Sequence, residues 1–294
     1  MIDYRLLTFM DLHETMNYTK TAQNLHITQP AVTQHIQYLE RKYHVQLFHY
    51  EKKHLECTKE GEYLYQHALS LVSGADKLLQ ELRYVGDERE TIHMGATMAV
   101  SENLVPQFLS ALYQRNPKLD LHLTLADTEV LLKAVREGNV DFAWVEGIFD
   151  KSEFRTHLLK KEEMILVLAK DHPLVQRKIV RLEDLLKEHL FLREEHGKNG
   201  DVLTQKLAQH NLTPHNFADC TSINQIAMIK KLVANGLGIT FLHESAVQEE
   251  MVNHTLVTRK VKGFKLMREF NMIAQKHSIY QRQYDTYFKF FKQL

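Results

Sequence analysis

The sequence predicts an α/β protein whose chain begins with a small helical head, continues through a long linker helix and ends in a two-lobed domain of alternating strands and helices. Three observations support this prediction. Short amphipathic segments fill residues 1–60, a heptad pattern of apolar residues runs from residue 63 to residue 85, and strand-like apolar runs alternate with helical segments from residue 91 onward.

The head contains three predicted helices. Apolar residues at helical spacing predict a first helix over residues 4–16, and Thr19 is a suitable N-cap for a second over residues 20–25. Thr28 is a suitable N-cap for a third helix, in whose first turn Pro30 is tolerated because that position needs no backbone N–H. The predicted buried stripe of this third helix consists of Val32, Ile36, Leu39 and Tyr43.

The polar face of the third helix is rich in glutamine and threonine, whose side chains both donate and accept hydrogen bonds. A glutamine can pair with adenine through two hydrogen bonds in the major groove. Two helices joined by a short turn, the second presenting its N-terminal residues, are typical of a helix-turn-helix, although an ordinary solvated face is the alternative for a single helix. The candidate DNA-binding residues here are Thr19, Lys20, Thr28, Gln29, Pro30, Thr33, Gln34, Gln37 and Arg41.

The next segment favours DNA binding. Residues 45–61 hold short apolar pieces around a polar centre, which predicts a two-stranded wing with Lys52 and Lys53 at its tip, suited to phosphate contacts. The head resembles the winged helix-turn-helix of LysR-type transcriptional regulators, and this family usually has arginine where the chain has Tyr50. The residues that carry the resemblance are Phe9, Ala22, Leu25, the run ITQPAVTQHI (27–36), the pairs LE (39–40) and LF (47–48), Thr58 and Gly61.

The predicted head carries no net charge. Residues 1–60 contain seven lysines and arginines and seven aspartates and glutamates, so counterion release should contribute little to nonspecific DNA binding. Six histidines in the same segment would add positive charge as the pH falls towards ~6.5, their ordinary pKa, which raises the hypothesis of pH-dependent DNA binding. Ordinary surface and packing roles for these histidines are the alternative.

The linker segment predicts a dimerisation helix. Apolar residues at positions 64, 68, 71, 75, 78, 82 and 85 alternate in spacing between four and three, which is the pattern of a coiled-coil seam. A long helix packed on its own domain is the alternative. The LysR resemblance also implies a dimerising linker helix, and two heads on a two-fold axis would recognise the half-sites of an inverted repeat.

From residue 91 the pattern predicts a parallel sheet with helices on its faces. Strand-like runs at 92–96, 119–126 and 140–147 alternate with helical segments at 101–115 and 129–137 to give a βαβαβ unit. A second series has strands at 163–170, 189–194 and 238–242 and helices at 201–211 and 223–234, and a strand at 267–276 and a helix at 279–292 close the chain.

Two such lobes enclose a cleft. The LysR resemblance implies a two-lobed effector domain like that of periplasmic binding proteins, with the chain crossing twice between the lobes. It divides the chain into a winged helix-turn-helix domain (1–60), a linker helix (61–87) and an effector domain (88–294). Within the effector domain it assigns about 91–160 and 268–294 to the first lobe and about 161–267 to the second.

The cleft should be lined by loops at strand ends and helix starts, where backbone N–H groups attract anions. The family uses the loop after the first strand for its effector, and Arg193 matches the arginine of a subgroup motif, REEGSGTR. Thr128 and Ser222 are also expected N-caps. The candidate effector-binding residues are Thr97, Met98, Ala99, Val100, Ser101, Thr128, Glu146, Arg193, Thr221 and Ser222.

The composition fits a soluble globular protein: 44% of the residues are apolar, and 37 basic residues balance 37 acidic ones. Two cysteines, Cys57 and Cys220, argue for a reducing compartment, and either could be a redox sensor or an ordinary buried thiol. No signal peptide and no apolar run of roughly 18 residues is present, so we expect a cytoplasmic protein without a membrane partner.

The motifs of metalloproteases, zinc-binding cysteine pairs, serine hydrolases and P-loop enzymes are absent from the sequence, so we expect no enzyme, no cofactor and no metal. The prediction is a sequence-specific DNA-binding transcriptional regulator of the LysR type, forming a homodimer or homotetramer. Its expected partners are double-stranded DNA with inverted-repeat half-sites and a small-molecule effector, with an anion as one option. A solute-binding protein without a DNA-binding role is the alternative, but it leaves the heptad seam and the glutamine-rich helix unexplained.

Overall fold

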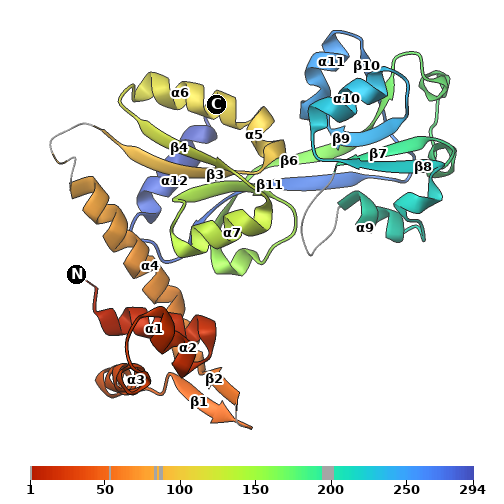
Figure 1. Cartoon of the computed structure of the whole chain (residues 1–294). Helices are drawn as coiled ribbons and strands as arrows, with labels where there is room; N and C mark the ends of the chain where they lie inside the picture. The colour runs from red at the N-terminus through yellow and green to blue at the C-terminus, as the bar shows by residue number, and fades with distance from the viewer. Residues whose placement is uncertain (1, 53, 83–84, 86–88, 194–201) are drawn as a thin grey trace.

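The computed structural model describes residues 2–52, 54–82, 85, 89–193 and 202–294. Within them, the N-terminal residues form a winged helix-turn-helix (Figure 1). Helices α1 (Tyr4–Thr15), α2 (Tyr18–Asn24) and α3 (Gln29–Tyr43) precede a hairpin of β1 (Phe48–Glu51) and β2 (His54–Cys57). The hairpin is antiparallel, with Phe48 opposite Cys57 and Glu51 opposite His54, and it forms the wing.

The ends of these helices follow local capping chemistry. Thr28 caps α3 as expected, since its hydroxyl accepts a hydrogen bond from Ala31 N at 3.3 Å. The prediction that Thr19 caps α2 was wrong: Asn17 does so, with Oδ1 accepting from Thr19 N and Lys20 N at 2.9 and 3.0 Å. Asparagine is a stronger N-cap than threonine, and it stands two residues earlier.

The stripe of α3 packs into the core of the head. Val32, Ile36 and Leu39 are at most 2% exposed and lie against Phe9 and Leu12 of α1. Tyr43, which was predicted to continue the stripe, is 44% exposed. Helix α3 ends there, because the next residue takes a left-handed conformation (φ 55°) and turns the chain towards the wing.

Helix α4 (Lys59–Leu82) connects the head to the larger domain (Figure 1). Its first half belongs to the head, where Ala68 is fully buried and Leu64 packs on the same core. Its second half rests on the larger domain through Lys77, whose ammonium lies 2.6 Å from the Asp141 carboxylate. The later seam residues Leu71, Leu78, Leu82 and Val85 remain between 49% and 78% exposed in the single chain.

A single nine-stranded sheet runs through the larger domain, in the order β4-β3-β5-β11-β6-β9-β7-β8, with β10 pairing β6. Four of its strands are β6 (Phe154–Ala169), β9 (Ile239–His243), β10 (Leu256–Arg259) and β11 (Leu266–Gln275). The others are β3 (Thr91–Ala96), β4 (Asp120–Leu125), β5 (Phe142–Glu146), β7 (His189–Arg193) and β8 (Asp219–Ile223).

The first lobe contains the expected βαβαβ unit, because β3 pairs in parallel with both β4 and β5. The helix predicted at 101–115 is two helices, α5 (Met98–Asn103) and α6 (Val105–Arg115). Pro106 lies in the first turn of α6, where its ring and missing N–H prevent one continuous helix. Helices α7 (Thr128–Glu137) and α12 (Gln281–Phe291) complete the lobe.

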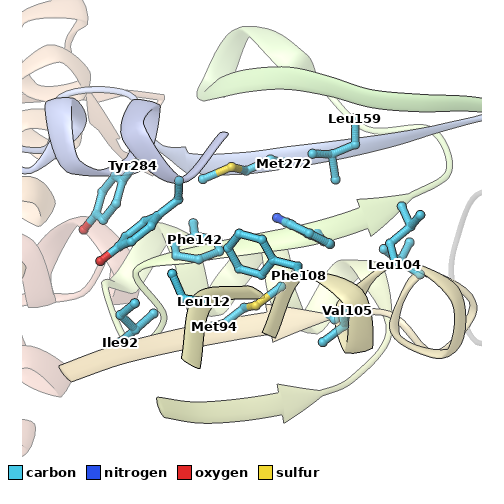
Figure 2. Packing of buried hydrophobic residues seen from close by; sticks show 14 of the residues in the cluster. Ile92, Met94, Leu104, Val105, Phe108, Leu112, Phe142, Leu159, Met272 and Tyr284 are labelled. Carbon is cyan, nitrogen blue, oxygen red and sulfur yellow. The ribbon is translucent and has the colours of Figure 1, made fainter. Parts of the chain in front are cut away.

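The core of the first lobe combines aromatic and aliphatic side chains (Figure 2). Phe108 of α6, Phe142 of β5 and Met272 of β11 are at most 1% exposed, and Tyr284 of α12 closes the cluster. The ring centroids of Phe108 and Trp144 lie 4.8 Å apart. This packing fixes the end of β5, and therefore the position of Glu146, relative to the helices around it.

The second lobe packs shorter helices on its part of the sheet: α8 (Leu182–Leu185), α9 (Val202–Ala208), α10 (Ile226–Ala234) and α11 (Gln248–Val252). Strands β7 and β8 are parallel, and β9 joins β7 in parallel and β6 in antiparallel fashion. The helix predicted at 223–234 begins later, at Ile226, because Ile223 still belongs to β8.

Two long strands cross between the lobes (Figure 1). Strand β6 has 16 residues, whereas the sequence predicted only its second half, and it pairs antiparallel with β11 from Leu266 opposite Met164 to Gln275 opposite Phe154. The boundaries expected at 160/161 and 267/268 therefore fall inside continuous strands. No helix in the described part of the chain is long and apolar enough to span a membrane.

Candidate functional site

The first candidate surface is the exposed face of α3 and the turn before it. Gln34, Gln37 and Arg41 are exposed on one side of α3, and Thr28, Gln29 and Pro30 are exposed at its start. Thr33 is half-buried, and its hydroxyl accepts a hydrogen bond from Gln29 Nε2 at 3.3 Å. Exposed glutamine and threonine side chains along the N-terminal part of a helix are the arrangement that base recognition needs.

The cationic candidates flank this face. Lys20 and Thr19 are exposed in the first turn of α2, and Lys52 is exposed at the tip of the wing. Tyr50, in the position where the family usually has arginine, is 68% exposed on strand β1 of the wing. The expectation for Lys53 lies outside the described residues. The surface thus combines hydrogen-bonding side chains with a few cations on its edges.

The second candidate site is a cavity of about 270 Å³ where the two lobes meet. Four of the predicted effector-binding residues line it: Thr97 after β3, Thr128 at the start of α7, Glu146 at the end of β5 and Arg193 at the end of β7. Carboxyl ends of parallel strands meet at one edge of a sheet, which is why residues so distant in sequence come together here.

The two threonines have different roles. The prediction that Thr128 is an N-cap was wrong, because Asp127 occupies that position. The Thr128 hydroxyl donates instead to the Glu146 carbonyl oxygen at 2.8 Å. Thr97 is 3% exposed, and its hydroxyl has no hydrogen-bond partner within the described ranges. A buried hydroxyl without a partner is costly, so Thr97 is suited to a ligand in the cavity.

Glu146 lies at the centre of a buried ionic cluster. Its carboxylate is 3.2 Å from Arg193 Nη1, 3.1 Å from His243 Nε2 and 3.4 Å from Arg268 Nη1. Burial alone would raise the pKa of this carboxyl, but the hydrogen bond to His243 and the charge of Arg268 outweigh it and lower the pKa to about 2. Glu146 is therefore ionised, and it faces two guanidinium groups and one imidazole.

The remaining predicted residues lie outside the lining of this cavity. Ala99 and Val100 are fully buried, with Val100 in the core of the first lobe, and the Ser101 hydroxyl donates to the Met98 carbonyl at 2.9 Å. Thr221 belongs to β8 and its hydroxyl bonds His189 Nε2 at 2.9 Å. Ser222 is exposed in β8 and is not an N-cap, because α10 begins four residues later with Gln225 as its N-cap.

Sequence reasoning missed two of the three partners of Glu146. Arg268 belongs to β11 and is 4% exposed, and His243 ends β9 and is 5% exposed. A charged residue inside an otherwise apolar strand was the available signal, because such a residue is rarely buried unless it is paired. The remaining lining residues that were not predicted are Asp127, Glu129, Leu132, Arg136, Gly147, Ile148, Phe149, Asp150, Glu153, Phe154 and Val202.

Neither cysteine has the environment of a redox sensor. Burial raises the pKa of Cys57 to about 11 and also raises the pKa of Cys220. Reactive cysteines have a lowered pKa, because the thiolate is the nucleophile. Among the histidines of the head, His35 has a pKa that burial lowers, and its Nδ1 lies 2.9 Å from the Thr8 hydroxyl. His35 therefore adds less positive charge under mild acid.

The two parts of the chain each match a family model. Residues 4–62 match the bacterial regulatory helix-turn-helix proteins of the lysR family, and residues 86–293 match the LysR substrate binding domain. The chain belongs to the LysR family. LysR-type regulators are transcriptional regulators that bind DNA and small-molecule effectors and form oligomers, and the helix-turn-helix match favours this function over that of a stand-alone solute-binding protein.

Relatives within the family align along most of the chain. The HTH-type transcriptional regulator CysL of Bacillus subtilis is 28% identical over 272 residues, covering 91% of this chain and 89% of CysL. BenM of Acinetobacter baylyi, another HTH-type transcriptional regulator, is 27% identical over 256 residues, covering 85% of this chain and 82% of BenM.

Solved structures share the fold. Full-length BenM superposes with a TM-score of 0.60 at 23% identity, covering all of this chain and 96% of BenM. The C206 mutant of Corynebacterium glutamicum OxyR superposes with a TM-score of 0.62 at 23% identity, covering 99% of this chain and 90% of OxyR. The LysR-type architecture of head, linker helix and effector domain therefore extends over the whole chain.

Proposed function

We propose that this LysR-type regulator binds a small anionic effector in the cavity between its lobes and that Thr97, Thr128, Arg193 and Arg268 hold it. The observation that carries this proposal is the set of unpaired donors in the cavity. The Thr97 hydroxyl and Arg193 Nε are both buried without a partner in the described part of the chain. Both residues line the cavity, beside the guanidinium of Arg268.

Charge and size narrow the effector class. Arg193 keeps a buried Nε donor and Thr97 a buried hydroxyl, neither with a partner in the described part of the chain, and these donors suit a carboxylate or another oxyanion. Two acidic side chains of the lining are engaged elsewhere: Glu153 pairs with Arg136 at 2.7 Å, and Asp150 accepts from Ser152 N at 2.8 Å. A cavity of about 270 Å³ suits a small metabolite rather than a drug-sized ligand, whose sites span ~300–1,000 Å³.

The same cavity offers a route to regulation. Glu146 belongs to the first lobe, whereas Arg193 and His243 belong to the second, so an anion that binds Arg193 competes with a contact between the lobes. An effector shifts the protein between two arrangements only if it binds one of them more tightly. Competition for Arg193 supplies that difference in affinity.

On the DNA side, we propose a dimer or tetramer that reads two half-sites of an inverted repeat. Pairing of two linker helices is supported by the exposed apolar residues of the seam, which are Leu71, Leu78 and Leu82 in α4 and Val85 beyond its end. Pairing presents two α3 helices to one duplex, and this multiplies the weak contacts of a head without net charge. A cytoplasmic location, where such DNA lies, belongs to the same proposal.

The effector proposal is tested by calorimetry on the full-length protein with a panel of small carboxylates and inorganic oxyanions, each paired with a neutral amide or alcohol of similar shape. We expect anions to bind and their neutral counterparts to fail. Thr97→Val, which removes the hydroxyl at nearly constant volume, and Arg193→Met should weaken binding by at least about tenfold, whereas Thr221→Val, on the distant strand β8, should not. Binding of neutral compounds alone, or unchanged affinity in both cavity variants, contradicts the proposal.

The DNA proposal is tested by footprinting the sequence upstream of the protein's own gene with the unmodified protein. We expect two protected half-sites of inverted symmetry whose spacing or bending changes with effector. Protection of a single half-site by a monomer would contradict it.

A further inference from the structure

Three side chains with metal-binding atoms meet where α1, β2 and α4 join, well away from the cleft. They are His13 of α1, Cys57 at the end of β2 and Glu62 in the first turn of α4, and one ligand atom from each lies within 4.8 Å of the other two. His13 Nε2 is 2.8 Å from Glu62 Oε1. Neither DNA recognition by α3 nor the effector cavity uses these residues.

Neighbouring side chains hold the cluster in place. The ring of Tyr65 stacks on the ring of His13, with centroids 3.7 Å apart and an interplanar angle of 15°, which fixes the direction of its nitrogens. Thr58 fixes the start of α4, since its hydroxyl accepts from Gly61 N at 3.0 Å and donates to the Gln46 carbonyl oxygen at 2.6 Å. Ligands that are already positioned lose little conformational entropy on binding a metal.

Gly61 allows the thiol to reach this site. A Cβ at position 61 would overlap Cys57 Sγ and would lie 2.5 Å from the Leu47 carbonyl oxygen. The sulfur is therefore packed directly against Gly61 in the first turn of α4, and Glu62 is the next residue of that turn. Only a residue without a side chain permits this approach.

The donor set matches the preferences of one metal. Imidazole nitrogen, thiolate sulfur and carboxylate oxygen are all common ligands of Zn²⁺, which binds them at about 2.0–2.3 Å in a tetrahedron. Tetrahedral geometry leaves a fourth position beside three protein ligands. A cavity of about 180 Å³ reaches His13, Glu62 and Tyr65, so a water molecule can enter and fill that position.

We infer that His13, Cys57 and Glu62 form a zinc site that ties the wing and α1 to the start of the linker helix. On binding, a Zn–S bond replaces the S–H bond of Cys57 and the proton passes to water, with no change of oxidation state. The hydrogen bond between His13 and Glu62 is exchanged for one Zn–N and one Zn–O bond, and the imidazole proton moves from Nε2 to Nδ1. Zinc thereby fastens the first turn of α4 to α1 and to the end of the wing.

The wing holds a second group of possible ligands, which provides a comparison. His49, Glu51 and Glu56 also bring one ligand atom each within 4.8 Å of the others, but all three lie on one hairpin and none is a thiol. The side chain of His49 is 41% exposed and that of His13 only 15%, whereas Glu56 and Glu62 are both 50% exposed. The thiol therefore distinguishes the proposed site in a spectrum.

The first test uses cobalt as a probe in the full-length, reduced, metal-free protein. We expect one Co²⁺ per chain to give a thiolate-to-cobalt charge-transfer absorption together with the intense visible bands of tetrahedral cobalt, and Zn²⁺ to remove both. Binding of Co²⁺ without a charge-transfer band would overturn the inference. This measurement needs no variant, so it decides the matter even if a variant fails to fold.

The second test measures zinc affinity by competition with a chromophoric chelator. Cys57→Ser and His13→Gln should each weaken binding by more than about 100-fold, since even outer partners of a metal ligand commonly contribute 10–100-fold. Cys220→Ser and His49→Gln are matched controls that should bind as tightly as the unchanged protein. Equal zinc affinity in Cys57→Ser, with folding verified by circular dichroism, would overturn the inference, whatever the result for the effector.

Discussion

Glu146 Oε1 lies 3.2 Å from Arg193 Nη1, and this ion pair joins the end of β5 in the first lobe to the end of β7 in the second. The pair is almost completely enclosed, since the two side chains are 6% and 17% exposed. Removing one member of such a pair leaves the other as a buried charge without its partner.

Replacing Glu146 with glutamine should therefore destabilise the protein by about 3–5 kcal/mol, the usual effect of breaking a buried ion pair from one side. The free energy of unfolding in urea measures this. Glu249→Gln, at an exposed position of α11, is the matched control and should change stability by less than about 0.5 kcal/mol. Equal stability of the two variants would show that Glu146 does not hold the lobes.

The same carboxylate should make the protein sensitive to acid. The pKa of Glu146 is lowered from 4.5 to about 2 in the folded state, so below pH 4.5 the unfolded chain takes up a proton that the folded chain refuses. The stability due to this group is complete above pH 4.5 and is lost as the pH falls towards about 2. Unfolding curves at pH 6 and ~3.5 should thus differ more in the unchanged protein than in Glu146→Gln, and parallel losses would contradict this.

Gln29 at the start of α3 should contribute to base recognition. Gln29→Ala should weaken specific binding by roughly 1–3 kcal/mol while nonspecific binding and its salt dependence stay unchanged. Gln23→Ala, on the exposed side of α2, is the control. Gel-shift titrations with operator and scrambled duplexes measure the ratio of the two affinities, and a constant ratio would remove Gln29 from the recognition surface.

The exposed half of the seam should hold two chains together. Leu78 and Leu82 are 49% and 56% exposed in the single chain, and the double change Leu78→Glu, Leu82→Glu places four like charges where two helices would pair. We expect sedimentation to show dissociation of the dimer at micromolar concentration. Leu79→Glu, one residue off the seam and 60% exposed, should leave it assembled. Equal sedimentation of both variants would place the interface elsewhere.

Gly138 should be required for the docking of α4 on the first lobe. It has φ +78°, and a Cβ there would overlap the Cβ of Ser73 on α4. Gly263 has φ +74° with no atom within 4 Å of an added Cβ, so Gly263→Ala should cost only the left-handed strain of roughly 1–2 kcal/mol. Gly138→Ala should cost clearly more in thermal unfolding, and equal losses would mean that α4 is not held against the lobe.

Local patterns predicted the elements well where one rule dominated. The stripe of α3 from Val32 to Leu39 and the cap at Thr28 are confirmed, because spacing and capping chemistry act within a few residues, whereas Tyr43 at the end of the stripe is exposed. Predictions failed where two rules competed. Asn17 displaced Thr19 as a cap, and Pro106 divided one expected helix into α5 and α6.

The cleft was harder to predict, because it depends on residues brought together by the sheet. Thr97, Thr128, Glu146 and Arg193 follow from the rule that sites form at strand ends, and all four line the cavity. Arg268 and His243 pair with Glu146 from strands that no local pattern connects to it. The length of β6 was also underestimated, because its first half, FRTHLLKK, has neither a continuous apolar run nor a regular alternation of apolar and polar residues.

Strands β6 and β11 remain hydrogen-bonded to each other from one lobe into the other, through a single bulge at Phe270 and Asn271. A hydrogen-bonded pair of strands can bend and twist, but it resists large rotations more than two flexible loops would. A ligand can therefore move the lobes only by small rotations that strain the ladder elastically. The regulation proposed above therefore rests on a small rotation of the lobes that changes how the two heads are presented to the duplex.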